Sequence, residues 1–287
     1  MPKPVTEIKE LYKISNEIRE NIIKSLEKAG SGHSAGPLGM ADVFTALYFN
    51  VLRHDPKRPH WRDRDRVILS AGHIVPVWYA TLAEAGYFPK RELWTLRKLG
   101  SPLQGHPEYH SIAGIENTAG PLGQGVSVAV GMAYSLRHFA KSNQQVYVIS
   151  SDGEQNEGQT WEAVMFAAKH RLPNLTMLMD RNNIQIDGAT EEVMPLDSIR
   201  AKYEAFNWHV IEVDGHNIKE VVDACNQAKA IVERPVCIIC HTIPGKGVKF
   251  MEGKYQWHGK SPKGAEARVA LRQLRTMGGK ISVIDSE

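Results

Sequence analysis

The segment Gln145-Val146-Tyr147-Val148-Ile149-Ser150-Ser151 runs directly into Asp152-Gly153-Glu154-Gln155-Asn156-Glu157-Gly158, and this junction decides the fold. The first half is apolar and β-branched, as in a strand that is buried on both faces. A helical pattern begins near Thr160, soon after the glycine-containing turn. A strand, a turn and a helix in this order predict one unit of a parallel α/β sheet.

The rest of the chain repeats this alternation of strand and helix patterns. Short apolar runs predict strands, and the amphipathic stretches between them predict helices. Together they indicate one α/β domain over 1–287, with a parallel sheet flanked by helices on both faces. We expect an N-terminal helix within 1–30 and a C-terminal tail over about 265–287. The predicted strands are 66–70, 145–151, 175–180, 208–214 and 235–242, and the main helices are 124–139, 160–170 and 219–232.

Composition excludes several classes of protein. The chain has 287 residues, a formal net charge of +3 and 42% hydrophobic residues, which suits a globular domain with a sizeable core. Its charges are spread along the chain, so we predict neither a nucleic-acid groove nor a membrane-binding patch. No apolar run approaches the roughly 18 residues of a membrane span. The start at Met1 lacks the apolar core of a signal peptide, so we expect a cytoplasmic protein.

Cys237 and Cys240 form a CxxC pattern, which can indicate redox chemistry or a zinc site. They lie in the predicted strand 235–242, where residues three apart point to opposite faces. The pattern therefore favours two small buried side chains over a metal site or a disulfide.

Polar residues follow two of the predicted strands. Asp152 and Gly153 come directly after the strand 145–151, and Asn182 follows the strand 175–180. Glycine backbone and the start of the following helix favour an anion such as a phosphate. Asp152, the Asn182 amide oxygen and a nearby backbone carbonyl would supply hard oxygen ligands for Mg²⁺ or Ca²⁺. The alternative is that each loop is a simple turn.

Four histidines lie in glycine-flanked loops: His33, His73, His106 and His258. A neighbouring glycine frees the backbone to present the imidazole, which can donate, accept or carry charge near neutral pH. Taken singly, each is more often a structural loop residue than a catalytic one, and their spacing does not match a metal site. We interpret His216, by contrast, as part of a turn and helix cap.

These motifs together resemble the thiamine diphosphate signature, and the chain resembles the amino-terminal, cofactor diphosphate-binding domain of transketolases. Asp152-Gly153 and Asn182 followed by Ile184 carry the signature, with Ser151 at its first glycine position. The resemblance covers nearly the whole chain. The other matching motifs are Ser31-Gly32-His33, Leu69-Ser70-Ala71-Gly72-His73, Gly105-His106-Pro107-Glu108, Gly120-Pro121-Leu122-Gly123-Gln124-Gly125 and Trp257-His258-Gly259.

The resemblance implies roles for individual residues. Asp152, Asn182 and the Ile184 carbonyl would hold the metal, Mg²⁺ or Ca²⁺. The residues implied for thiamine diphosphate binding are Gly120, Pro121, Leu122, Gly153, His73 and Asn182, and those implied for catalysis are His33, His73, His106 and His258.

In transketolases the glutamate that activates the cofactor lies in a pyrimidine-binding domain, for which the 287 residues leave no room. The resemblance therefore implies the amino-terminal subunit of a split transketolase, with a partner chain that supplies that domain in an α2β2 assembly. Its reaction would transfer a two-carbon ketol unit from a ketose phosphate to an aldose phosphate.

Three alternatives remain open. The first is another thiamine diphosphate enzyme, such as a 1-deoxyxylulose-5-phosphate synthase or a sugar-sulfonate ketol transferase. The second is a non-catalytic regulatory subunit. The third is a metal-dependent hydrolase that uses Asp152 and the histidines.

Overall fold

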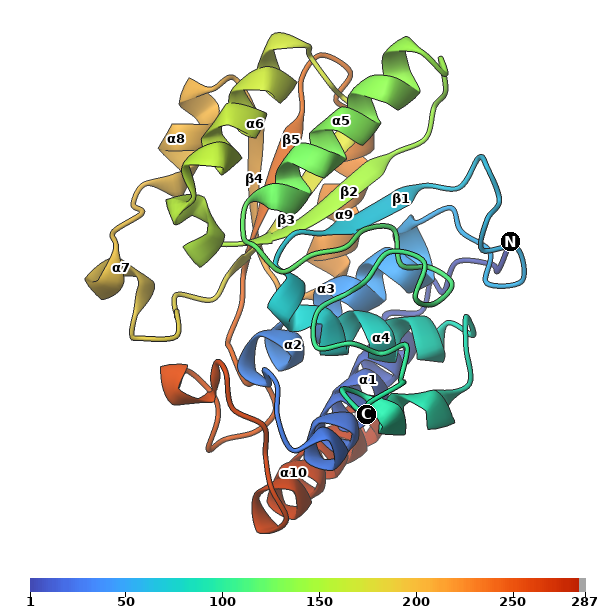
Figure 1. Cartoon of the computed structure of the whole chain (residues 1–287), viewed down its shortest axis with the longest axis vertical. Coiled ribbons are helices and arrows are strands. Elements are labelled where there is room, and N and C mark those ends of the chain that lie inside the picture. The colour runs from blue at the N-terminus through green and yellow to red at the C-terminus, as the bar shows by residue number, and fades with distance from the viewer. Residues whose placement is uncertain (284–287) are drawn as a thin grey trace.

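The computed structural model describes residues 1–283 and has a five-stranded parallel sheet at its centre (Figure 1). The order of the strands is β1-β2-β3-β5-β4, and every neighbouring pair is parallel. The expected sheet is thus confirmed, and each strand begins and ends within one residue of its predicted position. The strands are β1 (Arg66–Leu69), β2 (Val146–Ser151), β3 (Leu175–Arg181), β4 (His209–Asp214) and β5 (Val236–His241).

Helices cover both faces of the sheet, as predicted (Figure 1). One face packs on α5 (Gln124–His138), α6 (Gly158–Lys169) and α8 (Ile199–Ala205). The other face shares a hydrophobic core with α1 (Ile8–Ala29), α3 (Ala41–Ala46), α4 (Val75–Glu84) and α9 (Ile218–Ala230). The strands are apolar on both sides because both sides are buried.

The cysteine prediction is also confirmed. Cys237 lies in the core beneath α5 and α6, whereas Cys240 lies in the core on the opposite face of the sheet. Both are buried and free, as is Cys225. Burial raises the pKa of all three thiols, so they stay protonated and inert near neutral pH.

The first and last long helices of the described chain pack together. The expected N-terminal helix is α1, which ends at Gly30 in the left-handed conformation (φ 69°). The segment expected to be a C-terminal tail is instead a helix, α10 (Ala265–Val283), which packs against α1. Ala267, Ala270 and Leu274 lie on one face at helical spacing and are fully buried, and this stripe explains the helix.

Short helical segments fill the remaining connections and position the loops. They are α2 (Ala35–Gly39), η1 (Leu47–Val51), η2 (Gly72–Ile74), η3 (Lys90–Thr95), η4 (Gly153–Asn156), α7 (Thr190–Val193) and η5 (Tyr255–Trp257). Because all five strands are parallel, the loops after β1, β2, β3 and β5 reach the same edge of the sheet. Ligands of such sheets bind beyond this carboxyl edge.

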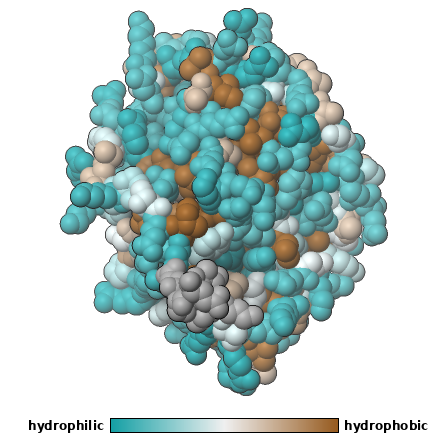
Figure 2. Space-filling view, turned by 180° about the vertical axis from the view of Figure 1, so that it is seen from behind, coloured by the Kyte–Doolittle hydropathy of each residue, from teal (hydrophilic) through white to brown (hydrophobic). Residues whose placement is uncertain are grey.

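The described surface has the mixed character of a globular domain. Figure 2 shows the face opposite to that of Figure 1, where hydrophilic side chains predominate and hydrophobic ones form separate patches. Within residues 1–283, no helix combines the length and the apolar composition that crossing a membrane requires.

Candidate active site

A cavity of about 410 Å³ lies at the carboxyl edge of the sheet. It brings together the residues predicted for metal, cofactor and catalysis, although they come from segments far apart in the sequence. Pro121 is the exception: it is exposed beside Gly120 and is not among the described residues that line the cavity. The predicted residues that line it are His33, His73, His106, Gly120, Leu122, Asp152, Gly153, Asn182, Ile184 and His258.

Asp152 follows the last residue of β2 and is almost fully buried, with a relative exposure of 1%. Its Oδ1 accepts a hydrogen bond from the Gly153 N–H (2.7 Å), and its Oδ2 accepts one from the Asn183 N–H (2.7 Å). Burial raises the pKa of Asp152, and these hydrogen bonds together with the Arg181 guanidinium counteract that shift. The loops after β2 and β3 therefore meet at this carboxylate, as the sequence predicted.

Arg181, the last residue of β3, links Asp152 to the segment around α7. Its Nη1 lies 3.3 Å from the Asp152 carboxylate. Its Nη2 lies 2.7 Å from Glu191 and 3.3 Å from Asp197. The role of Arg181 was not predicted from the sequence, because its partners come from the loop after β2 and from the segment around α7, which only the fold brings together.

Asn182 is oriented by a second buried carboxylate, Asp180. The Asn182 Nδ2 donates to Asp180 Oδ2 (2.6 Å), so its Oδ1 is the atom that accepts from the Ile184 N–H (3.0 Å). The Thr242 hydroxyl also donates to Asp180. Burial raises the pKa of Asp180 to about 7, with a further contribution from the nearby Asp152. Asp180 was also missed, although a carboxylate at the end of a buried strand is a usable signal.

These residues fit a divalent cation that prefers hard oxygen ligands. The Asp152 carboxylate and the fixed Asn182 amide oxygen lie on neighbouring loops, and Ile184 lines the same cavity. No group of three or more His, Cys, Asp or Glu side chains could hold a metal ion within residues 1–283. The two side-chain oxygens of Asp152 and Asn182 would leave most positions of a six-coordinate cation open to other ligands and to water.

The four histidines form one cluster in the wall of this cavity. The His33 ring centroid lies 5.2 Å from that of His73, 6.3 Å from that of His106 and 5.6 Å from that of His258. The centroids of His73 and His258 are 5.0 Å apart. The imidazoles of four glycine-flanked loops thus lie close together. If each histidine had only a structural role in its own loop, there would be no reason for the four rings to cluster.

The histidines are held neutral and poised for hydrogen bonding. Burial, and then the neighbouring His258, His106 and Arg97 in that order, together lower the pKa of His33 to about 4. Burial also lowers the pKa of His73, His106 and His258. The buried Nδ1 atoms of His33 and His258 have no hydrogen-bond partner among the described residues. Buried polar atoms without partners are rare in proteins, and here they indicate a polar ligand.

Glu154 is a further residue of the site that the sequence did not reveal. It is fully buried, and it accepts hydrogen bonds from the Gly123 N–H (2.6 Å), Ser70 Oγ (2.5 Å) and Ser150 Oγ (2.7 Å). These bonds tie the loop after β1 and the start of α5 to η4. Burial raises the pKa of Glu154, and the three donors counteract that shift. Glu154 is a positioning residue for the cavity wall.

Arg97 places a positive charge beside the histidines. Its Nε donates to Ser31 Oγ (2.9 Å), next to the loop that carries His33. A Cβ atom at Gly105 would lie 2.1 Å from the Arg97 Nη1, so any larger residue directly before His106 would displace the Arg97 guanidinium.

Comparisons with known proteins agree with this geometry. A family model described as the transketolase thiamine diphosphate-binding domain matches residues 11–280. The 6-deoxy-6-sulfo-D-fructose transketolase subunit SqwG of Clostridium sp. (strain MSTE9) is 43% identical over 264 residues, which cover 92% of this chain and 96% of that subunit. An apulose-4-phosphate transketolase subunit from Phocaeicola vulgatus is 38% identical over 260 residues, which cover 91% of this chain and 92% of that protein.

A solved structure shows the same fold. Transketolase from Pichia stipitis in complex with sedoheptulose-7-phosphate superposes with a TM-score of 0.88 and 34% identity, covering 95% of this chain and 41% of that one. The fold and site thus define a thiamine diphosphate-binding domain. The chain belongs to the transketolase family. Within the family it matches proteins named as subunits along nearly their whole length, in agreement with the predicted amino-terminal subunit.

Proposed function

We propose that this chain is the diphosphate-binding subunit of a two-chain transketolase that transfers a two-carbon ketol unit from a ketose to an aldose. The observation that carries this proposal is the convergence of Asp152, Asn182 and four histidine rings on one cavity. A separate metal-dependent hydrolase is not favoured, because the described residues provide no cluster of metal-binding side chains.

Asp152, Asn182 and the Ile184 carbonyl would hold Mg²⁺ or Ca²⁺. The Gly153 backbone would face the diphosphate, where a helix N-terminus and closely approaching N–H groups favour negative charge. A Cβ at Gly120 would meet no atom within 4 Å, so the space beside this residue is open. Gly120, Pro121 and Leu122 would then lie near the aminopyrimidine. When bound, thiamine diphosphate supplies a thiazolium carbanion that stabilises the transferred unit.

The histidines would act on the sugar. His33, His73, His106 and His258 are neutral near pH 7, so each offers one donor and one acceptor nitrogen. Ketol transfer requires proton movements at hydroxyl and carbonyl oxygens, which such groups can relay. The unpartnered Nδ1 atoms of His33 and His258 would bind substrate hydroxyls. The enclosing rings would also limit access of water to the reacting atoms.

A partner chain would complete the site. It would supply the pyrimidine-binding domain and the activating glutamate, and the assembly would be α2β2. Several large apolar side chains of α5 and α6, and Phe139 directly after α5, are exposed to solvent, which suits a subunit interface. Their relative exposures are 45% for Val128, 75% for Phe139, 56% for Met165 and 44% for Phe166. The two relatives named above are likewise called subunits.

The substrates fall within one chemical class. The relatives are named for a sulfonated fructose and for apulose 4-phosphate, so an anionic group at the far end of the sugar is their shared feature. Arg97 beside His33 and His106 is a cation of this chain near such a substrate. We propose a ketose that carries a phosphate or a sulfonate as donor, and a cytoplasmic site of action. The alternatives are a synthase that keeps the cofactor and a regulatory subunit without activity.

Native mass spectrometry of the complex purified from its own host tests the assembly. The expected result is a second type of chain, with thiamine diphosphate and a divalent ion retained. Ketol transfer by that complex is then measured with xylulose 5-phosphate, 6-deoxy-6-sulfofructose and apulose 4-phosphate as donors. A partner that is fully active without this chain would support the regulatory alternative. A homo-oligomer that binds no cofactor would overturn the proposal.

A further inference from the structure

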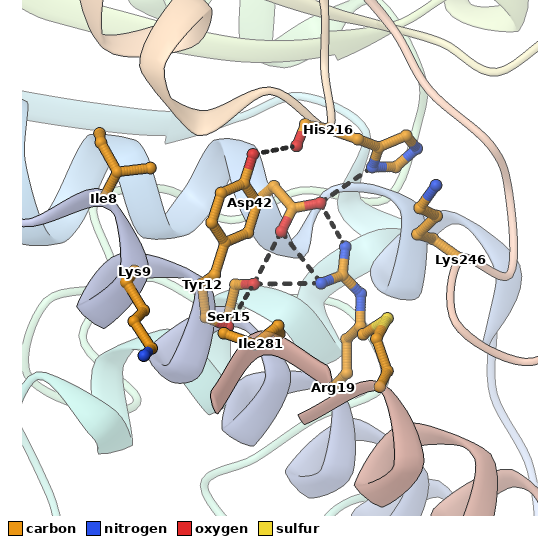
Figure 3. A pocket seen from close by; sticks show the side chains of 10 residues that line it. Ile8, Lys9, Tyr12, Ser15, Arg19, Asp42, His216, Lys246 and Ile281 are labelled. Carbon is orange, nitrogen blue, oxygen red and sulfur yellow. Dashed lines mark hydrogen bonds and ion pairs between the residues drawn. The ribbon is translucent and has the colours of Figure 1, made fainter. Parts of the chain in front are cut away.

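A buried hydrogen-bond network centred on Asp42 lies away from the candidate active site (Figure 3). Asp42 accepts from Ser15 Oγ (2.7 Å) and from the Nη1 and Nη2 atoms of Arg19 (3.0 and 2.5 Å), and His216 Nδ1 lies 2.9 Å from its Oδ2. None of these residues lines the cavity of the candidate site. Each Asp42 oxygen thus has two partners within the fold, so the network joins α1, α3 and the turn before α9 to one another.

His216 therefore has a different role from the predicted one. The cap of α9 is supplied by Asn217, whose side chain accepts a hydrogen bond from the Glu220 N–H. His216 instead joins the turn before α9 to α3 and to the loop after β5.

Asn117 is another buried polar residue that joins separate segments, and here both segments carry residues of the candidate site. Its relative exposure is 4%. Its Oδ1 accepts a hydrogen bond from the Leu69 N–H (3.0 Å), and its Nδ2 donates to the Leu69 carbonyl (2.9 Å). These two bonds reproduce the pairing that a neighbouring strand would give, so the Asn117 side chain takes the place of a strand beside the end of β1.

The end of β1 needs this partner because β1 is an edge strand. It has a neighbour, β2, on one side only. The Ser70 N–H donates to the Ile149 carbonyl of β2 (2.9 Å), so the backbone groups of the preceding residue, Leu69, point away from β2. Leu69 is fully buried, and buried backbone groups without partners are costly. Asn117 thus satisfies two groups that the sheet leaves unpaired.

The residues after Asn117 are paired with the loop that carries His106. The chain forms no helix or strand over 96–123, so individual hydrogen bonds must hold this stretch. The Ala119 N–H donates to the carbonyl of Pro107 (3.1 Å), which directly follows His106. The position of His106 therefore depends on where the stretch that begins at Asn117 is attached.

The same stretch touches the loop that carries His73. A Cβ atom at Gly72 would lie 2.9 Å from the Ala119 Cβ and 3.0 Å from the Gly120 nitrogen. Gly72 directly precedes His73, so the two backbones are in close contact beside that imidazole. Residues 117–120 thus lie between the two histidine loops and contact both.

We propose that Asn117 is a positioning residue of the candidate active site. By binding both outward-facing backbone groups of Leu69, it holds residues 117–120 between the two loops and sets how the imidazoles of His73 and His106 lie relative to each other. Asn117 does not line the cavity, so it acts through these residues. The inference rests on the proposed function, which assigns the two histidines to the substrate.

Two measurements on the assembled complex test the positioning without reference to activity. Asn117→Ala is expected to speed hydrogen exchange over 105–120 at least tenfold. It is also expected to raise the rate at which diethyl pyrocarbonate modifies His106 at least threefold, with His209 at the amino edge of the sheet as the internal reference. Unchanged exchange and unchanged modification in Asn117→Ala would overturn the proposal.

Asn174→Ala is the matched control. Asn174 is also buried, and its Nδ2 donates to the Ala133 carbonyl (3.0 Å), but it directly precedes β3 and so lies at the opposite edge of the sheet from the site. We expect this variant to lower Tm and to leave exchange over 105–120 and the modification of His106 unchanged. Equal changes in the two variants would reveal a general effect of stability and would overturn the proposal.

A milder variant covers the case in which Asn117→Ala does not assemble. Asn117→Asp keeps the acceptor for the Leu69 N–H and loses the donor to the Leu69 carbonyl. It is expected to change exchange over 105–120 and the modification of His106 in the same direction. Values equal to those of Asn174→Ala would overturn the proposal.

Ketol transfer by the complex supplies the functional readout. Asn117→Ala is expected to lower kcat at least tenfold, whereas Asn174→Ala is expected to keep it within twofold. Equal losses in the two variants would overturn the positioning role. An unsubstituted complex that is inactive with every donor would overturn the proposed function instead, and the exchange and modification rates would still decide whether Asn117 positions His106.

Discussion

Replacement of Asp42 by Asn is expected to destabilise the chain strongly, although the two side chains have nearly the same size and shape. Arg19 and Asp42 have relative exposures of 2% each, and Asp42 accepts from three side chains. Asp42→Asn leaves the Arg19 guanidinium buried without a counter-ion. It also replaces an accepting oxygen with an amide N–H group, which faces the donors of Ser15, Arg19 and His216 and finds no acceptor among them.

The structure gives the size of this effect. Removal of one partner of a buried ion pair costs about 3–5 kcal/mol, because the remaining charge stays desolvated. For a chain of this size each kcal/mol lowers Tm by roughly 2–4 °C, so we expect a decrease of about 6–20 °C. The pair also joins α1 to α3 across the loop that carries His33, so stability and the shape of the active site are coupled here.

Equilibrium urea denaturation followed by circular dichroism measures the free energy of unfolding. Asp223→Asn is the matched control, because it breaks an exposed pair with Lys219 and should leave the midpoint nearly unchanged. The double variant Arg19→Met with Asp42→Leu removes both charges and should recover most of the stability. A loss below about 1 kcal/mol for Asp42→Asn, or a double variant no more stable than the single one, would refute this reasoning.

Three further predictions concern the site. The folded pKa of His33, about 4, lies below its ordinary value of 6.5, so its contribution to stability is present above pH 6.5 and is lost as pH falls toward 4. As the pH is lowered from 6.5 toward 4, the unfolding free energy of His33→Gln should therefore fall less steeply than that of the unsubstituted chain. Glu154→Gln keeps an acceptor for the Gly123 N–H and should cost about 1 kcal/mol, whereas Glu154→Ala should cost about 3 kcal/mol by thermal unfolding. Arg181→Leu should speed hydrogen exchange over 190–197, because Glu191 and Asp197 lose their shared partner.

Each of these has an outcome that contradicts it. Parallel pH profiles for His33→Gln and the unsubstituted chain would mean that His33 titrates normally in the fold. Equal costs for the Gln and Ala variants would show that the Glu154 hydrogen bonds are not what joins the loops. Unchanged exchange over 190–197 in Arg181→Leu would mean that other contacts hold this segment.

The sheet and the meeting of the loops after β2 and β3 could be predicted because their signals are local. A β-branched run followed by Asp152-Gly153 identifies a strand end without reference to the rest of the chain, and the anion site beside it stays a prediction. The four histidines were found in the same way, through the glycines beside them. The parallel sheet accounts for the placement of His73 and His258, which follow β1 and β5, whereas His33 and His106 lie in connections between helices that only the fold brings there.

The missed features depend on distant contacts. Glu154 lies within the quoted motif, but its role is set by Ser70 and Gly123, which only the fold brings to it. Arg181 was taken as part of the strand end, and its three carboxylate partners come from elsewhere. Helix α10 was expected to be a tail, because its stripe of alanines is weakly hydrophobic and becomes a core face only against α1. Spacing along the chain carries none of this information.

The central claim is that Asp152 and Asn182 bind the cofactor through a divalent cation. Calorimetric titration of thiamine diphosphate into the complex that contains this chain, with Mg²⁺ and then with a chelator, tests it most directly. We expect one cofactor per copy of this chain, with binding that requires the cation and is lost in Asp152→Asn but retained in Asp223→Asn. Unchanged affinity in Asp152→Asn, or full affinity in the presence of the chelator, would contradict the assignment.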